Sequence, residues 1–162
     1  MAFDRIIGQD VQRQRLMDAF MQNRLAHAYL LYGPSGTGVD ALAIELAKAV
    51  NCTKGPGEPC QACPACRKIQ ALQHPDLHLL LPSSSTKSVK EDDKDTENSG
   101  RSDVRLDRRI EFIEALARDP YAPLNFNKND YLSVDDIRAL RQAAYIKPYE
   151  ARRKVVIIVS AD

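Results

Sequence analysis

The stretch Ala28-Tyr29-Leu30-Leu31-Tyr32-Gly33-Pro34-Ser35-Gly36-Thr37-Gly38-Val39-Asp40 decides the fold class of this sequence. Its first five residues form a short apolar run, which is typical of a strand buried on both faces. A glycine-rich turn over 33–38 follows, and residues 39–50 then show helical spacing of apolar side chains. Strand, glycine turn and helix in this order predict the start of a βαβ unit.

Similar patterns lie on both sides of this unit. Residues 77–81 and 154–159 have the composition of two more buried strands. The amphipathic segments that we expect to form further helices are 11–24, 104–118 and 133–144. Because strands alternate with helices, we predict the α/β class, with a parallel sheet in a three-layer P-loop-like arrangement.

Two features of the chain's organisation depart from a plain α/β domain. Residues 83–131 are expected to be an insertion, because the family resemblance given below covers the rest of the chain and leaves them out. Within this segment the polar residues 83–103 are expected to be disordered, because they cannot bury enough surface to offset the entropy of ordering. The chain stops three residues after its last strand. We therefore expect 1–162 to be the N-terminal part of a larger domain, with an incomplete sheet.

The glycine turn only partly matches the phosphate-binding template G-x-x-x-x-G-K-[S/T]. Gly33 and Gly38 fit, and the variable positions are filled by Pro34, Ser35, Gly36 and Thr37. Val39 stands where a lysine should reach the β- and γ-phosphates, and Asp40 stands where a hydroxyl should hold Mg²⁺. The carboxylate adds repulsion of about 1 kcal/mol in water and about 4 kcal/mol near a protein surface for one charge pair at ~4 Å.

The last strand predicts the same loss of chemistry. Hydrolytic P-loop proteins place an Asp, often followed by Glu, after their third strand, and here Val159 and Ser160 occupy those places. We expect a degenerate nucleotide site that neither binds nor hydrolyses ATP, and hence no catalytic residues. The alternatives are an ordinary strand-to-helix turn that never meets nucleotide, or residual anion binding by backbone amides.

The four cysteines are spaced Cys52-x7-Cys60-x2-Cys63-x2-Cys66. Two overlapping C-x2-C steps in a reducing compartment suit tetrahedral Zn²⁺, and four sulfur ligands leave no open position for water. We therefore predict a structural zinc module over 51–67. Disulfides and an iron–sulfur cluster are the alternatives.

The composition excludes several function classes. The net charge of +1 gives no reason to expect tight nucleic-acid binding by this chain alone. The sequence lacks a signal peptide and any apolar run of ~18 residues, so we expect a cytoplasmic protein that makes no membrane contact. His27, His74 and His78 have no catalytic partner at a recognised spacing and are expected to be structural.

Several segments together resemble bacterial clamp-loader subunits, which are AAA+ proteins of the DNA polymerase III holoenzyme. The segments that carry the resemblance are Ile6-Ile7-Gly8-Gln9, residues 27–34, the four cysteines, His74-Pro75-Asp76, Ile137-Arg138, Lys147-Pro148-Tyr149-Glu150 and residues 154–158. Within that family, gamma/tau subunits are active ATPases, whereas delta-prime subunits have degenerate nucleotide motifs and retain the zinc module. Val39, Asp40, Val159 and Ser160 make this chain similar to the delta-prime kind.

The resemblance implies a function in DNA replication. It implies a non-hydrolysing subunit that works with gamma/tau and delta to open the sliding clamp and load it onto primed DNA. It also implies a sheet of order 5-1-4-3-2, in which both neighbours of the 28–32 strand, and a Ser-Arg-Cys arginine, lie beyond residue 162. The first strand should then lack partners within this chain. The alternative functions are an ATP-binding gamma/tau-like ATPase and a zinc-dependent DNA-binding module.

Overall fold

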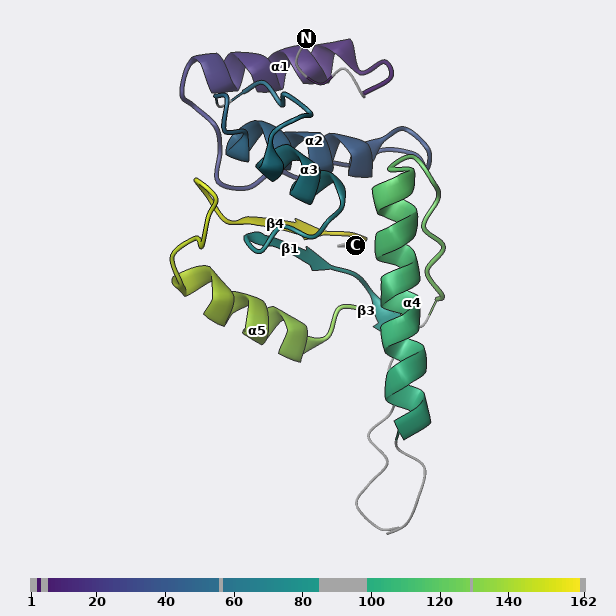
Figure 1. The fold of residues 1–162 in the computed structure, drawn as a ribbon. Helices are drawn as coiled ribbons and strands as arrows, with labels where there is room; N and C mark the ends of the chain where they lie inside the picture. Colours follow the sequence, from purple (N-terminus) through teal and green to yellow (C-terminus); the bar gives the residue numbers. More distant parts are fainter. Residues whose placement is uncertain (1–2, 4–5, 56, 85–98, 129, 161–162) are drawn as a thin grey trace.

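A computed structural model describes residues 3, 6–55, 57–84, 99–128 and 130–160, with side chains left out for 84 and 99–107 (Figure 1). Helices and strands alternate along much of the chain. In order, the elements are α1 (Asp10–Met21), α2 (Val39–Asn51), α3 (Pro64–Gln70), β1 (Leu77–Leu80), β2 (Ser83–Ser84), α4 (Ser99–Arg118), β3 (Asp130–Tyr131), α5 (Val134–Tyr145) and β4 (Val155–Ile158). No helix among the described residues is long and apolar enough to cross a membrane.

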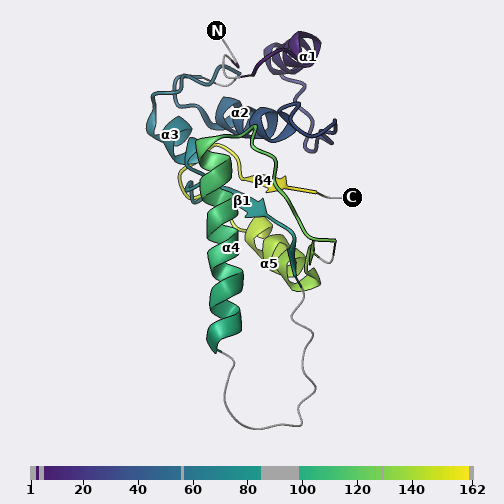
Figure 2. The same cartoon turned by 90° about the vertical axis from the view of Figure 1, so that its right-hand side faces the viewer.

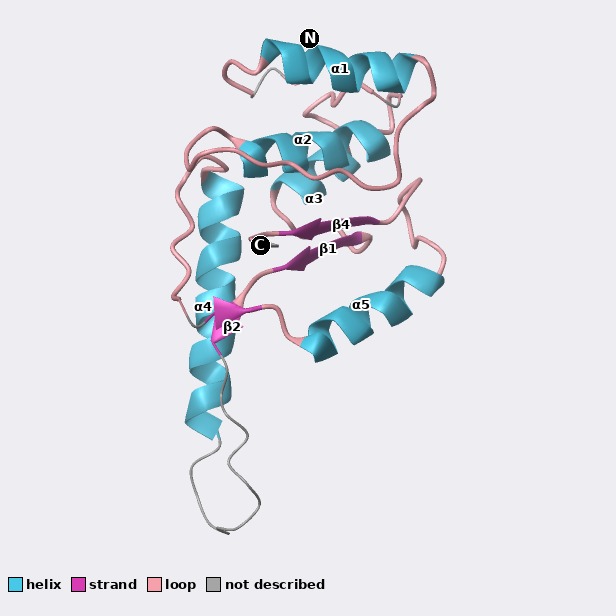
Figure 3. Ribbon diagram, turned by 180° about the vertical axis from the view of Figure 1, so that it is seen from behind, coloured by secondary structure: helices cyan, strands magenta, loops and turns pink. Residues whose placement is uncertain are grey.

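A small parallel sheet is the centre of the fold. Strands β1 and β4 pair with Leu77 opposite Val155 and Leu80 opposite Ile158. Helices α2 and α3 cover one face of this sheet and α5 lies along the other, as Figures 1 and 3 show from opposite sides. The parallel pairing and the helices on both faces agree with the α/β prediction, although the sheet has only two strands among the described residues.

The main core lies between the sheet and helices α2, α3 and α4. Its buried members are Ile44, Ala47, Ile69, Leu77, Leu81, Leu116, Ile157 and Val159. Because strand side chains alternate between faces, the odd-numbered positions of β1 and β4 point into this core. A second cluster joins α1 to α2 through Leu16, Ala41, Leu42 and Ala49, together with Phe3 and Ile6.

The predicted first strand, 28–32, is not a strand in the structure. The segment is extended but makes no ladder with any described residue, and Leu30 and Tyr32 are 80% and 88% exposed. An extended segment becomes a strand only when a neighbour satisfies its backbone groups. The sheet order 5-1-4-3-2, from which we expected this segment to lack partners, stays a prediction.

The segment that we expected to be an insertion contains a helix that is longer than predicted. Helix α4 begins at Ser99, five positions before the predicted start at residue 104. It lies beside the carboxyl ends of β1 and β4 and runs steeply across the direction of these strands, as Figures 1 and 2 show together. Leu116 near its end is buried in the main core. The predicted disorder over 83–103 largely falls on 85–98, which lie outside the described residues, whereas Ser83 and Ser84 form β2 and 99–103 are helical.

Helix α5 has the predicted start but not the predicted burial. The Ser133 hydroxyl accepts a hydrogen bond from the Asp135 amide at 3.2 Å, as expected of an N-cap. None of the residues of α5 is buried, and Ile137 is 42% exposed, although the amphipathic spacing of 133–144 predicts a buried side. The apolar side of α5 is therefore largely uncovered by the described chain.

Candidate functional site

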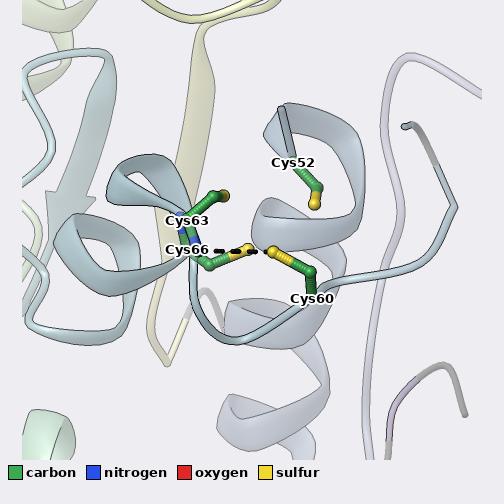
Figure 4. Close-up of side chains that lie close together, drawn as sticks. All are labelled: Cys52, Cys60, Cys63 and Cys66. Atoms are coloured by element: carbon green, nitrogen blue, oxygen red, sulfur yellow. Dashed lines mark hydrogen bonds between the residues drawn. The ribbon is translucent and has the colours of Figure 1, made fainter. Parts of the chain in front are cut away.

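The four cysteines come together at the carboxyl end of α2, as predicted. Their sulfur atoms all lie within 4.8 Å of one another, and their side chains point toward a common centre in Figure 4. None is in a disulfide. A tetrahedral ion with Zn–S bonds of about 2.3 Å needs sulfurs about 3.8 Å apart, so the cluster fits a single Zn²⁺ with little adjustment.

Local backbone structure positions each cysteine. Cys52 is the C-cap of α2, and Cys63 is the N-cap of α3, with Pro64 at the first helical position, where a missing N–H does no harm. Two amides point at sulfur atoms: Cys63 N–H at Cys60 Sγ (3.3 Å) and Cys66 N–H at Cys63 Sγ (3.4 Å). Amides directed at sulfur favour the thiolate, which is the form that binds metal.

The protonation preferences of the thiols differ with their surroundings. Burial opposes ionisation of Cys63, but hydrogen bonds from Thr53 and from the Cys66 amide outweigh it and lower its pKa to about 5. Backbone hydrogen bonds from Ala62 and Cys63 lower the pKa of Cys60. Burial, followed by the hydrogen bond to Cys63, raises the pKa of Cys66. The surroundings thus favour the thiolate at Cys60 and Cys63 and oppose it at Cys66, and a bound dication would favour ionisation of all four.

A buried polar network lies beneath the cysteine loop (residues 52–66). Lys48 and Glu45 on α2 are 0% and 2% exposed and form an ion pair of 2.6 Å. Gln61, between two cysteines, accepts from Lys48 Nζ at 3.0 Å and donates to Glu45 Oε2 at 2.7 Å. Gln70 on α3 also accepts from Lys48, and its amide nitrogen donates to the Ala117 carbonyl of α4 at 3.1 Å. The network therefore ties the cysteine loop to three helices.

The glycine loop (residues 33–38) has the expected place, directly before helix α2. Gly36 and Gly38 both have φ of 81°, a backbone region that favours glycine, and Gly38 is the N-cap of α2 without any side-chain cap. Thr37 closes the turn: its hydroxyl and its amide donate to the Pro34 carbonyl at 2.7 and 3.2 Å. The loop thus leads from an extended segment into a helix, as a phosphate-binding loop does.

The two residues that depart from the template lie in the first turn of α2. Val39 and Asp40 are both half-buried, and burial raises the pKa of the Asp40 carboxyl. A carboxylate at a helix N-terminus interacts favourably with the helix dipole, the same interaction that would otherwise favour a bound phosphate. The Asp40 carboxylate would therefore compete with a bound phosphate for the N-terminus of α2.

The two positions after the last strand contribute no acidic ligand. Val159 is 6% exposed and packs in the same core cluster as Ile44 of α2, and its amide donates to the Leu80 carbonyl at 3.0 Å. Ser160 is exposed, with φ of 50°. The structure thus brings Val159 beneath α2 as a packing residue, which is chemically consistent with the loss of a metal-binding carboxylate there.

Asp76 holds the loop before β4, a role that sequence reasoning missed. Its buried carboxylate accepts three backbone hydrogen bonds, from Tyr149 (2.7 Å), Glu150 (2.9 Å) and Ala151 (2.8 Å). Burial opposes the charged form, but these three amides outweigh it and lower the pKa of Asp76. No neighbouring residue in the sequence indicates that Asp76 binds this loop. The only signal was that residues 74–76 and 147–150 both contribute to the family resemblance.

Comparisons with known proteins agree with these observations. The sequence profile of the family described as "DNA polymerase III, delta subunit" matches residues 8–162. DNA polymerase III subunit delta' of Bacillus subtilis is 45% identical over 67 residues, 41% of this chain and 20% of that protein. The delta' subunit of Pseudomonas aeruginosa is 41% identical over 68 residues, 41% of this chain and 21% of that protein.

A gamma/tau-type protein is similar to nearly the same extent. DNA polymerase III subunit tau of Bacillus subtilis is 44% identical over 68 residues, 41% of this chain and 12% of that protein. The aligned part thus spans about a fifth or less of these relatives. The profile match covers nearly all of the present sequence, and on that ground the chain belongs to the DNA polymerase III delta subunit family.

Proposed function

We propose that this chain is the N-terminal part of a non-hydrolysing, delta-prime-type subunit of a clamp loader. It would work with gamma/tau-type and delta-type subunits to open the sliding clamp and place it on primed DNA. One observation carries the proposal: a loop with phosphate-loop geometry has Val39 and Asp40 where the catalytic Lys and Ser/Thr would stand. The family membership and the delta' relatives support the same reading.

In this proposal the four cysteines hold a structural Zn²⁺. A single ion fits sulfurs within 4.8 Å of one another. An iron–sulfur cluster spreads four thiolates over two irons in [2Fe–2S] or four irons in [4Fe–4S], and so needs wider spacing between at least some of the sulfurs. The ion would supply the cross-link that fixes the cysteine loop against α2. No water position remains at a four-sulfur site, so its role is to stabilise rather than to catalyse.

The second candidate is an active gamma/tau-type ATPase, which the similarity to the tau subunit favours. Against it, an Asp40 carboxylate near the phosphates costs about 1–4 kcal/mol per charge pair at ~4 Å, and the attraction of a lysine is also lost. These deficits oppose both binding and phosphoryl transfer, because that reaction depends on positioning and charge stabilisation.

Phosphate release and clamp loading separate the two candidates. The full-length protein alone should release no phosphate from Mg·ATP above a buffer control. Mixed with gamma/tau-type and delta-type subunits, it should be required for loading clamp onto primed DNA, and Val39→Ala should leave that loading unchanged. If the isolated protein hydrolyses Mg·ATP with saturable kinetics and Gly38→Val abolishes this activity, the proposal is wrong and the chain is an active ATPase.

A further inference from the structure

The turn that follows α4 presents one aromatic side chain in a fixed direction. Asp119 accepts from the Ala122 amide through its carbonyl (3.0 Å) and from the Tyr121 amide through its carboxylate (2.9 Å). Asp at the first position and Pro120 at the second are the residues that favour a type I turn. Tyr121, at the third position, is therefore held by backbone constraints on both sides.

This side chain reaches the amino end of α2. A Cβ added to Gly38 would lie 2.5 Å from Tyr121 Cε1 and 2.9 Å from its Cζ, so the ring contacts the bare glycine backbone directly. The Tyr121 hydroxyl accepts a hydrogen bond of 2.7 Å from the Ile7 amide, and the ring packs against the cluster that joins α1 to α2. The ring thus bridges the glycine loop and the segment before α1, which are 31 positions apart (38 minus 7).

Further contacts hold the segment that carries Tyr121. Downstream, Leu124 and Phe126 pack against the main core, and the Phe126 ring lies 4.9 Å from that of Phe112 on α4. The Asn127 amide then donates to Asp130 Oδ2 at 2.7 Å. The strap (residues 119–127) is therefore anchored at both ends, with Tyr121 between α4 and the glycine loop.

A phosphate-binding loop uses glycine where ligand and backbone must come close. Here the bare face of Gly38, the helix N-cap, is already covered by an aromatic ring from the same chain. We propose that the strap is a built-in plug, with Tyr121 occupying the mouth of the glycine loop and excluding a nucleotide. Exclusion of the nucleotide by Tyr121 acts in addition to the loss of the lysine and the hydroxyl. The proposal gives the strap a role that does not depend on whether the chain loads clamps.

The alternative role for Tyr121 is a buttress that supports the loop from the side away from any ligand. The two roles predict opposite results once the missing side chains are restored. Removing a plug opens the site and tightens nucleotide binding, whereas removing a buttress loosens the loop and weakens binding or leaves it unchanged.

The test uses the full-length protein with the loop repaired by Val39→Lys and Asp40→Thr, titrated calorimetrically with Mg·ATP. Adding Tyr121→Ala to the repaired protein should tighten binding by at least about tenfold. Tyr121→Phe, which keeps the ring and loses only the hydroxyl, is the matched control and should stay within about twofold of the repaired parent. Metal content and the thermal midpoint check that each variant is folded.

Tyr121→Leu replaces Tyr121→Ala if the alanine variant does not fold, because leucine keeps apolar packing and vacates most of the ring volume. Tighter binding in either variant supports the plug. Equal, weaker or absent binding after ring removal in a folded protein overturns it, since an emptied mouth should admit the nucleotide.

Discussion

Replacing Asp76 by alanine tests the three-amide anchor described above. The change leaves the amides of Tyr149, Glu150 and Ala151 without their acceptor. A hydrogen bond to a charged group contributes about 1.5–3 kcal/mol when buried. Because Tyr149 is 86% exposed and water can reach this loop, we take about 1 kcal/mol for each bond, or about 3 kcal/mol in total.

Hydrogen–deuterium exchange of the full-length protein at pH 7 measures this loss locally. A peptide covering 147–154 should exchange roughly 100-fold faster in Asp76→Ala, because each 1.36 kcal/mol is a factor of ten. Asp76→Asn should give an intermediate rate, since its one carbonyl oxygen can still accept while its NH₂ faces an amide donor. Asp135→Ala is the control: that exposed side chain forms a surface ion pair with Arg138, which contributes about 0–1 kcal/mol.

The pH dependence of this anchor follows from the lowered pKa of Asp76. Its contribution to stability is fully present above the pKa of the unfolded chain and is lost as the pH falls through the lower folded pKa. Measurement at pH 7 therefore sees the whole effect. An unchanged exchange rate over 147–154 in a folded Asp76→Ala protein would show that the carboxylate does not hold this loop.

Three further predictions concern the buried ion pair, the cysteine cluster and the N-cap of α5. Lys48→Met should lower the free energy of unfolding by about 3–5 kcal/mol, because Glu45 is left charged and buried, and Lys48→Met with Glu45→Leu should recover part of that loss in chemical denaturation. Cys60→Ser should reduce zinc, measured by elemental analysis, from about one ion per chain to a small fraction of that, whereas Thr53→Ser should retain it. Ser133→Ala should cost about 1 kcal/mol and increase amide exchange in the first turn of α5, and normal exchange there would contradict the N-cap assignment.

The sequence was sufficient for features that depend on local pattern. The helix after the glycine loop, the helical segment that begins near residue 133 and the four-sulfur cluster all follow from residue type and spacing, and the structure reproduces them. For the helices, the residues that decide the structure lie within a few positions of one another. For the cysteines, the spacing itself is shared by few other kinds of site. The parallel pairing of β1 with β4 was likewise expected from alternation of strands and helices.

Features that depend on distant partners could not be predicted in this way. The 28–32 segment has strand composition, yet a strand also needs a neighbour, and the described chain offers none. The anchor at Asp76 joins residues about 75 positions apart, and Tyr121 meets a residue 114 positions away. Lys48 reads as a surface residue by composition, because lysine is buried only when paired, and its partners come from three separate segments.

Helix α2 has a consequence for how this chain tolerates changes in length. Its thirteen residues run from the glycine at the N-cap to the first cysteine at the C-cap, with no spare residue at either end. One added or removed residue would turn everything beyond it by about 100° and displace it by about 1.5 Å. Cys52 would then face away from its three companions. Residues 38–52 should therefore accept substitutions but not insertions or deletions, so homologous sequences should keep this spacing fixed while their loops vary in length.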